Sequence, residues 1–340
     1  MNAVTVGHTT RPSTPSTIED DLKALWRDVA RQTPVTRASM ANLVVFLECG
    51  PGDHVDFDAR IGAVPIADVV RLHPSRVIVL HHWTGDAAAG APIAAAVSVV
   101  TFGTGQACYG FEQIAVRSAC ADASLPSIVR SLMRGDVPTS IWWTEDVSRV
   151  APAGTIVAMG RQLVYDSRAW RDVRRGVLAL SPYIQGHGPP DLADLNWRRL
   201  TALRQALVHA SRTMLTEQKV GVGDVEIAHR PGEAAVAWLL AGWLASRLTE
   251  GSPGRIPVRV EERPHAEEIL AVSFGEAPNA LTAMMNDQRV VITAAGGAPP
   301  FYVAVRQESE ADAVVAELRM LSRDPCLHDA LAALARHFAA

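Results

Sequence analysis

The segment with the strongest indication of the fold is Leu132–Trp143, which reads LMRGDVPTSIWW. Its last five residues, Thr139–Trp143, predict a buried strand, in which Trp142 and Trp143 must point to opposite faces of a sheet. Each indole can bury roughly 150–250 Å², so a sheet covered on one face only would leave one tryptophan in water. We therefore expect helices on both faces of this sheet, or a partner protein on one of them.

Other uninterrupted apolar runs predict further strands of the same sheet. They are residues 43–47, 77–80, 94–102, 111–116 and 162–165. Helical spacing predicts a first helix with a Ser16–Glu19 capping box, a short helix over 126–133, and a helix capped by Ser167. Buried strands with intervening helices indicate a three-layer α/β domain around a mixed sheet, in which 94–116 forms an antiparallel hairpin.

The rest of the chain predicts a second domain. Residues 182–190 are rich in glycine and proline and lack periodicity, which is typical of a linker. Helices are expected over 200–214, 234–248, 311–321 and 326–337, and strands over 256–260, 269–274, 289–293 and 301–305. We predict a disordered N-terminus (1–16), an α/β domain (17–180), a linker (181–190) and a smaller α+β domain (191–340).

Composition excludes several classes of function. The 340 residues are 48% hydrophobic and 20% charged, with a net charge of −4, which gives no basic footprint for nucleic acid. The longest apolar run, Ala234–Ala245, is too short to span a bilayer, and the N-terminus lacks a secretion signal. Cys49, Cys108, Cys120 and Cys326 have no zinc or C-x-x-C spacing. We expect a cytoplasmic protein with neither nucleic-acid nor membrane partners.

The motifs of common catalytic sites are missing from the sequence. Gly103-x-Gly105 is followed by Cys108 where a G-x-G-x-x-G loop requires glycine, and there is no P-loop, H-E-x-x-H or G-x-S-x-G. A dehydrogenase that binds its own nicotinamide normally needs the first of these motifs. The sequence therefore predicts no catalytic residues, no metal ligands and no cofactor, and the chain is not expected to be a dehydrogenase itself.

Two segments could hold an anion or another small ligand. His73, Ser75 and Arg76 precede or begin a predicted strand; alternatively, Pro74 only fixes a turn and Arg76 pairs with a carboxylate. Asp166 follows the carboxyl end of a strand, where open α/β sheets bind ligands. Its alternative role is a hydrogen bond to nearby backbone beside the Ser167 cap.

The segment Asp194-Leu195-Asn196-Trp197-Arg198 predicts the start of a helix. Asp194 or Asn196 can cap its backbone N–H groups, and Trp197 and Arg198 are residue types that anchor interfaces. The candidate partner-binding residues are therefore Trp142, Trp143, Asp194, Asn196, Trp197 and Arg198; the alternative is that this segment is purely structural. Cys108 and Cys120 are either two buried thiols or a disulfide across the strand between them.

Five segments in this order resemble the glucose-6-phosphate dehydrogenase assembly protein (OpcA) family. They are His73–Ile78, Glu112–Ile114, Asp136–Trp143, Val164–Ser167 and Asp194–Trp197, within a likeness that covers roughly Leu43 to Leu207. Val137 stands where leucine is expected, and Tyr109-Gly110 where some relatives carry a further cysteine.

The resemblance implies a non-catalytic partner of glucose-6-phosphate dehydrogenase, the enzyme that makes NADPH at the entry of the pentose phosphate pathway. Such a factor would assist its assembly or act as an allosteric activator. The alternative is an α/β enzyme or sensor that binds a sugar phosphate or nucleotide at the strand ends, near His73, Arg76 and Asp166.

Overall fold

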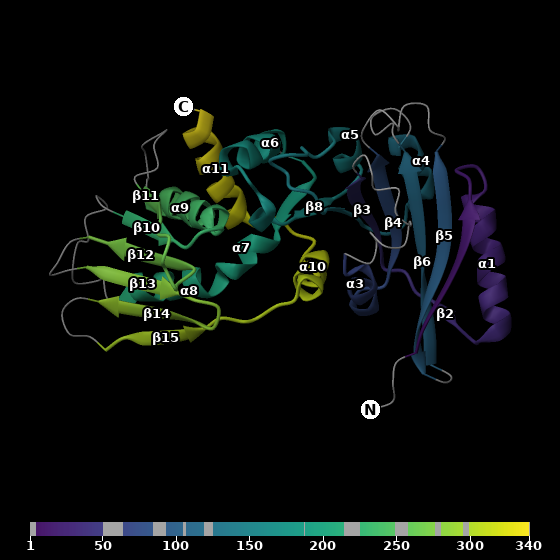
Figure 1. The fold of residues 1–340 in the computed structure, drawn as a ribbon, viewed down its shortest axis with the longest axis horizontal. Coiled ribbons are helices and arrows are strands. Elements are labelled where there is room, and N and C mark those ends of the chain that lie inside the picture. Colours follow the sequence, from purple (N-terminus) through teal and green to yellow (C-terminus); the bar gives the residue numbers. More distant parts are fainter. Residues whose placement is uncertain are drawn as a thin grey trace.

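The computed structural model describes residues 5–49, 64–83, 93–104, 107–118, 125–186, 188–213, 225–248, 258–275, 280–294 and 299–339. These residues form two β-sheets, one of nine strands and one of six. Figure 1 shows the larger sheet at the right and the smaller one at the left, with helices α7, α10 and α11 between them.

The larger sheet contains a parallel core. Its strands are β1 Thr5–Ser13, β2 Thr36–Arg37, β3 Ala41–Cys49, β4 Ser75–Trp83, β5 Ala94–Thr104, β6 Ala107–Ser118, β7 Thr139–Trp143, β8 Gln162–Tyr165 and β9 Asp191–Asp194. They lie in the order β1-β5-β6-β4-β3-β7-β8-β9, with β2 beside β6. From β6 to β9 every neighbouring pair is parallel. Numbered along the chain, these six strands have the order 3-2-1-4-5-6, which is that of doubly wound dinucleotide-binding domains.

Helices cover both faces of this sheet, as the two adjacent tryptophans predict. One face packs with α1 Ile18–Gln32, α4 Leu125–Leu132, α5 Gly154–Val157 and α6 Val173–Gln185. The other face packs with α3 Ile66–Leu72 and with α10 Glu310–Arg319 from the end of the chain. Trp143 lies in the first of these cores and Trp142 in the second, and each side chain is 1% exposed. The prediction of a three-layer α/β domain is confirmed.

The prediction of disorder over residues 1–16 is wrong for residues 5–13, whereas residues 1–4 lie outside the described residues. Thr5–Ser13 form β1, which pairs antiparallel with β5 from Thr5 opposite Gly103 to Ser13 opposite Ala95. This segment carries threonines rather than large apolar residues, so its order depends on ladder hydrogen bonds that local hydrophobicity does not reveal. Helix α1 has Thr17 rather than Ser16 at its N-cap, without a side-chain capping bond.

The boundary between the domains also differs from the prediction. Helix α6 continues through Pro182 to Gln185, and β9 pairs with β8, so the first sheet extends beyond the expected linker. Asp172, not Ser167, caps α6 by accepting the Arg175 N–H, while Ser167 begins the short 3₁₀ helix η2, Ser167–Ala169. Strand β9 escaped prediction because it is only four residues long and therefore carries little periodicity.

The smaller sheet is mixed. Its strands are β10 Val225–His229, β11 Val258–Glu262, β12 Leu270–Phe274, β13 Leu281–Met285, β14 Arg289–Ala294 and β15 Phe301–Ala304. They lie in the order β11-β10-β12-β13-β14-β15; β10 and β11 are parallel and the other pairs antiparallel. The sequence prediction missed β10 and β13.

One face of this sheet packs on α8 Thr201–Thr213 and α9 Ala234–Leu248. Helix α11, Pro325–Ala339, packs on α9 and on α6 of the first domain. The α9–α11 approach needs Gly242, where a Cβ atom would lie 2.6 Å from the Ala330 carbonyl oxygen. Among the described residues, no helix combines the length and apolarity that crossing a membrane requires.

Candidate functional site

The two tryptophans that organise the fold are internal. Trp143 stacks on Phe46 with ring centroids 3.8 Å apart, and its indole N–H donates to the Val150 carbonyl over 3.0 Å. Trp142 fills the opposite face of the same strand. With both side chains covered by the chain's own helices, neither offers a surface to a partner in this conformation.

The switch point of the doubly wound order lies between the first and fourth parallel strands, here β3 and β7. The loop after β3, residues 50–63, is outside the described residues. The described part of the switch point contains the Phe46–Trp143 stack and two hydrogen bonds between the end of β3 and the residues that follow β7. Thr144 donates its hydroxyl to the Phe46 carbonyl over 2.7 Å, and Glu145 accepts the Glu48 N–H over 2.8 Å.

A buried polar network lies at the carboxyl ends of β8 and β9. Asp194 Oδ1 accepts the N–H groups of Ser167 (3.1 Å) and Asn196 (2.9 Å). The Asn196 amide donates to the Ser167 hydroxyl over 3.0 Å. These bonds cap the short helix α7, Leu195–Arg199, and tie it to η2. Asp194 and Asn196 thus hold the chain together where the two domains join.

Burial changes the protonation of this network. Desolvation, reinforced by the charge of Asp166, raises the pKa of Asp194 to about 7. The other carboxylate oxygen, Oδ2, is buried with no hydrogen-bond partner within the described chain, as is the hydroxyl of Tyr165 on the neighbouring strand. Burial, and then the charge of Asp194, raises the pKa of Tyr165 well above its ordinary value.

Helix α7 also carries side chains that link the domains. The Trp197 indole donates to Asp324 over 2.8 Å, and the Arg204 guanidinium lies 3.8 Å above the indole ring. Arg198 forms a two-bond ion pair with Glu308, both bonds 2.9 Å long, and a further 2.8 Å bond with Glu317. Hydrogen bonding to Glu308 raises the pKa of Arg198.

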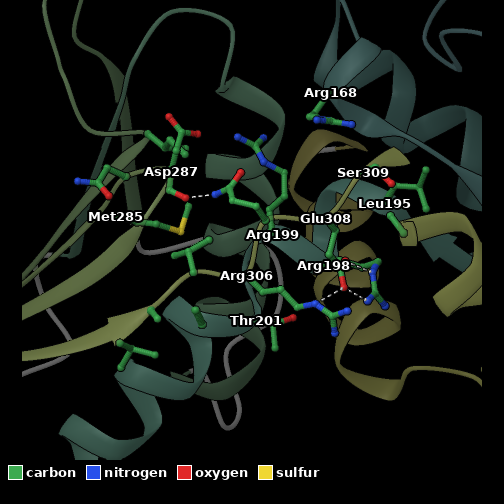
Figure 2. Close-up of a pocket in the computed structure, with 18 of the residues that line it drawn as sticks. Arg168, Leu195, Arg198, Arg199, Thr201, Met285, Asp287, Arg306, Glu308 and Ser309 are labelled. Carbon is green, nitrogen blue, oxygen red and sulfur yellow. Dashed lines mark hydrogen bonds and ion pairs between the residues drawn. The ribbon is translucent and has the colours of Figure 1, made fainter. Parts of the chain in front are cut away.

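A cleft of about 420 Å³ opens beside this junction, between α7, α8, the start of α10 and the ends of β13 and β15. Figure 2 shows Arg168, Arg198, Arg199 and Arg306 projecting around it. Three of these guanidiniums are held by carboxylates: Arg168 by Asp166, Arg198 by Glu308 and Glu317, and Arg199 by Glu233. Arg306 is largely exposed at the rim, where its Nε lies 3.7 Å from the Glu308 carboxylate.

The charge of the cleft is close to balanced. Its lining includes Asp287, Glu308 and Glu310 as well as the four arginines, and burial followed by the charge of Asp166 raises the pKa of Glu310. A polyphosphate would need an excess of guanidinium groups without carboxylate partners. The cleft therefore suits a polar ligand with little net charge better than a nucleotide.

The predicted anion-binding residues do not share one site. His73, Ser75 and Arg76 lie at or just before the start of β4, whereas Asp166 follows the end of β8. All intervening strand pairs are parallel, so these residues occupy opposite edges of the sheet. A single pocket near His73, Arg76 and Asp166 is therefore excluded. Ser75 donates its hydroxyl to the His73 carbonyl over 2.9 Å, and Asp166 accepts the Arg168 N–H over 2.9 Å.

Arg76 pairs with carboxylates, as the alternative interpretation of the His73–Arg76 segment predicted, and it belongs to a charged cluster around Glu112, which was not among the candidate residues. Buried Glu112 on β6 accepts the Trp26 indole N–H over 2.7 Å and a guanidinium N–H of Arg134 over 3.2 Å. Arg37 pairs with the same carboxylate, and Arg76 Nε lies 3.6 Å from it. Arg76 also pairs with Glu19. The available signal was a glutamate inside an otherwise apolar strand, because such a charge must find partners when buried.

The described residues contain no candidate metal site. No group of three or more histidine, cysteine or acidic side chains converges there in a way that could hold a metal ion. Cys49 Sγ lies 3.5 Å from His81 Nδ1. The Cys108–Cys120 disulfide considered from the sequence involves Cys120, which lies outside the described residues.

These features define a two-domain α/β protein, with a doubly wound first sheet joined through a polar junction to a mixed second sheet. The chain belongs to the glucose-6-phosphate dehydrogenase assembly protein (OpcA) family. Residues 67–181 match the domain described as "Glucose-6-phosphate dehydrogenase subunit N-terminal domain", and residues 190–331 match the corresponding "C-terminal domain".

Two curated relatives carry the name OpcA. The one from Nostoc punctiforme is 28% identical over 206 residues, which cover 58% of this chain and 43% of the relative. The one from Synechocystis is 27% identical over 156 residues, covering 45% and 31%. The chain thus matches less than half the length of either relative.

Solved structures show only a distant likeness. A super-repressor mutant of Gal80p from Saccharomyces cerevisiae aligns with a TM-score of 0.45 and 8% identity, over 87% of this chain and 94% of Gal80p. A mutant of the 3-ketoreductase KijD10 from Actinomadura kijaniata aligns with a TM-score of 0.41 and 12% identity, over 88% and 95%. These values are too low to carry functional information.

Proposed function

We propose that this protein is a non-catalytic assembly or activation factor that binds glucose-6-phosphate dehydrogenase in the cytoplasm. The observation that carries the proposal is the match of both halves of the chain to domains described as glucose-6-phosphate dehydrogenase subunit domains. The missing G-x-G-x-x-G sequence favours a partner role over a dehydrogenase activity of its own.

A factor of this kind acts through a difference in affinity for two states of the enzyme. A coupling of about 1–3 kcal/mol changes an affinity about 5- to 150-fold. A rigid factor can express such a difference at low entropic cost. The ion pairs of Arg198 and Arg199, together with the Trp197–Asp324 bond, would supply this rigidity by fixing one domain against the other.

Of the six candidate partner-binding residues, Arg198 is the one whose side chain reaches the surface. We therefore propose Arg198 as the contact residue, and Trp142, Trp143, Asp194, Asn196 and Trp197 as its structural support. Truncating an arginine that becomes buried in an interface typically lowers the binding free energy by about 2 kcal/mol, which is about a thirtyfold loss of affinity.

The test is to add the purified protein to its cognate dehydrogenase and to measure activity and oligomeric state. We expect activity to rise, or a larger oligomer to form, with saturation at high concentration because binding follows mass action. Arg198→Ala should weaken the effect about thirtyfold. The matched control is Arg247→Ala, which removes a surface arginine paired with Asp329. Both variants must first melt like the parent protein.

A parent protein that neither binds nor activates the cognate dehydrogenase would refute the proposed function. Equal activation by the Arg198→Ala and parent proteins would refute only the contact residue. The isolated protein is also expected to show no dehydrogenase activity, and calorimetric titration with NADP is expected to give no binding. Micromolar NADP affinity would contradict the non-catalytic role.

The cleft favours a second candidate function, a sensor of a small polar metabolite. It lies at the carboxyl ends of β8 and β9, where ligands of open α/β sheets bind. An uncharged sugar such as glucose should then raise the melting temperature of the parent protein, and Arg306→Ala should reduce that shift. An unchanged melting temperature at millimolar ligand would count against the sensor.

A further inference from the structure

The smaller sheet carries an apolar row on the face opposite α8 and α9. Residues directly opposite one another on antiparallel strands point to the same face. The pairs Ala228–Ala271, Ala271–Met284, Met284–Val291 and Val291–Tyr302 therefore form one continuous line across β10, β12, β13, β14 and β15. The next residues along each strand, such as Ile227, Val272 and Ala283, belong to the core beneath.

The row has a bulky end and a hollow end. At the β15 end, Tyr302 is 59% exposed, and Met284 at the middle of the row is 38% exposed. At the β10 end, Ala228 and Ala271 line a hollow of about 410 Å³, whose wall is formed by residues 261–266 and Glu268. A protruding ring and a hollow thus lie at opposite ends of the same row, with Met284 halfway between them.

We infer that this face binds a second copy of the same chain. A two-fold axis parallel to the strands and passing beside Met284 exchanges the two ends of the row. Tyr302 of each copy then enters the hollow of the other, Val291 faces Ala271, and Met284 meets Met284. Such an interface is isologous, because one patch serves both subunits. Two sheets stacked face to face lie about 10 Å apart, which is filled by side chains of these sizes.

The charges favour the same pairing. The guanidinium of Arg289 lies 5.5 Å from the centre of the Tyr302 ring, so the protruding end carries a positive charge. Glu262 and Glu268 lie around the hollow, together with Glu261, which pairs with Arg259 over 3.6 Å. The one arginine that lines the hollow, Arg263, is already paired with Glu226 over 2.6 Å. In the two-fold arrangement, the positive end of each copy meets the acidic rim of the other. Copies related in this way satisfy both contacts at once.

The size of the face predicts a weak, reversible dimer. Five strands about 4.8 Å apart, with about five residues of 3.3 Å each, give a face of roughly 24 by 17 Å. This is about half of the roughly 800 Å² per partner that stable complexes bury. We therefore expect self-association at micromolar concentrations. The inference does not depend on the proposed function.

The experiment is sedimentation velocity of the full-length protein from low to high micromolar concentration. The parent should change from monomer to dimer. Met284→Glu should weaken the dimer at least tenfold, because the axis brings two copies of the new carboxylate together. Tyr302→Glu should weaken it similarly by facing the acidic rim, whereas Tyr302→Lys should retain more association. The control is Met40→Glu, which adds the same charge at an exposed methionine outside this sheet.

A second measurement tests the symmetry. In a Met284→Cys protein, a short bismaleimide should link two copies through residue 284, and mass spectrometry of the linked peptide should identify the 284–284 pair. A parent protein that stays monomeric at all concentrations would overturn the inference. So would a folded Met284→Glu protein that dimerises like the parent, or a monomeric parent whose binding to the dehydrogenase is lost on Met284→Glu.

Discussion

Two buried carboxylates at opposite edges of the larger sheet are stabilised in different ways. Glu112, level with the start of β4, is surrounded by the guanidiniums of Arg37, Arg76 and Arg134 and by the Trp26 indole. Asp194, at the end of β9, accepts two backbone N–H groups, and within the described chain no guanidinium bonds to it. The negative charge of a buried carboxylate is thus compensated by guanidinium groups in the first case and has almost no compensation in the second.

The two buried acids differ in what surrounds the carboxylate. A carboxylate surrounded by guanidiniums joins α1, β4, β6 and the segment before β7 through charge, and removing it would leave positive charges facing one another. A carboxylate held only by dipoles loses hydration without a counter-ion, so its ionised form is disfavoured. This explains why the pKa of Asp194 rises to about 7.

The largest effect is expected from replacing each acid by its amide. Glu112→Gln should lower the free energy of unfolding by about 3 kcal/mol at pH 8, because loss of one partner leaves a buried guanidinium uncompensated. Asp194→Asn at the same pH should cost little or stabilise the protein, because it removes an ionised group from a buried position. Urea unfolding followed by tryptophan fluorescence measures both.

The control for this pair is Glu226→Gln, which neutralises a surface partner of Arg263. Exposed ion pairs contribute at most about 1 kcal/mol, so this variant should unfold nearly like the parent. If Glu112→Gln and Asp194→Asn cost the same, the contrast between the two edges is not electrostatic.

A second effect, up to a similar size, is expected from pH. Because the pKa of Asp194 is about 7 in the folded chain against 3.8 ordinarily, the folded state binds a proton that the unfolded chain has released. The contribution of Asp194 to stability should therefore fall as pH rises from about 4 to 7, and then level off, by at most about 4 kcal/mol at 1.4 kcal/mol per pH unit. The difference in unfolding free energy between the parent and Asp194→Asn, measured from pH 4 to 8, should follow this curve; a constant difference would contradict it.

The smallest effect is expected beside Asp194. The Tyr165 hydroxyl is buried without a hydrogen-bond partner in the described part of the chain. Tyr165→Phe therefore removes a group that loses its hydration on folding and gains no hydrogen bond in exchange. Thermal melting should give an unchanged or slightly higher midpoint, equivalent to about 0.5–1 kcal/mol. A clear loss of stability would mean that the hydroxyl is satisfied in solution, for example by water.

Much of the first domain could be predicted from the sequence because its signals are local. The Thr139–Trp143 and Gln162–Tyr165 strands have the predicted bounds, since short apolar runs between polar turns leave little freedom. The adjacent tryptophans required cover on two faces because strand side chains alternate. Strands β1, β9, β10 and β13 escaped prediction. For β1 and β9, pairing with a strand far away in the chain contributes more to their order than their own hydrophobicity.

The candidate site was less predictable, since it depends on which segments meet. His73, Arg76 and Asp166 could be grouped as strand-end residues from the sequence, but parallel pairing puts strand starts and strand ends at opposite edges. Arg198 was recognised as a residue type that forms strong contacts. Its actual partners, Glu308 and Glu317, lie more than a hundred positions later in the chain.

The family, the α/β class and the burial of both tryptophans could be predicted from residue type and short-range periodicity. The 3-2-1-4-5-6 strand order, the return of α10 to the first domain, and the separate surroundings of Glu112 and Asp194 became visible in the folded chain alone. The physical reason is that hydrophobic burial is encoded in each segment, whereas strand order and charge compensation depend on contacts between segments far apart in the chain.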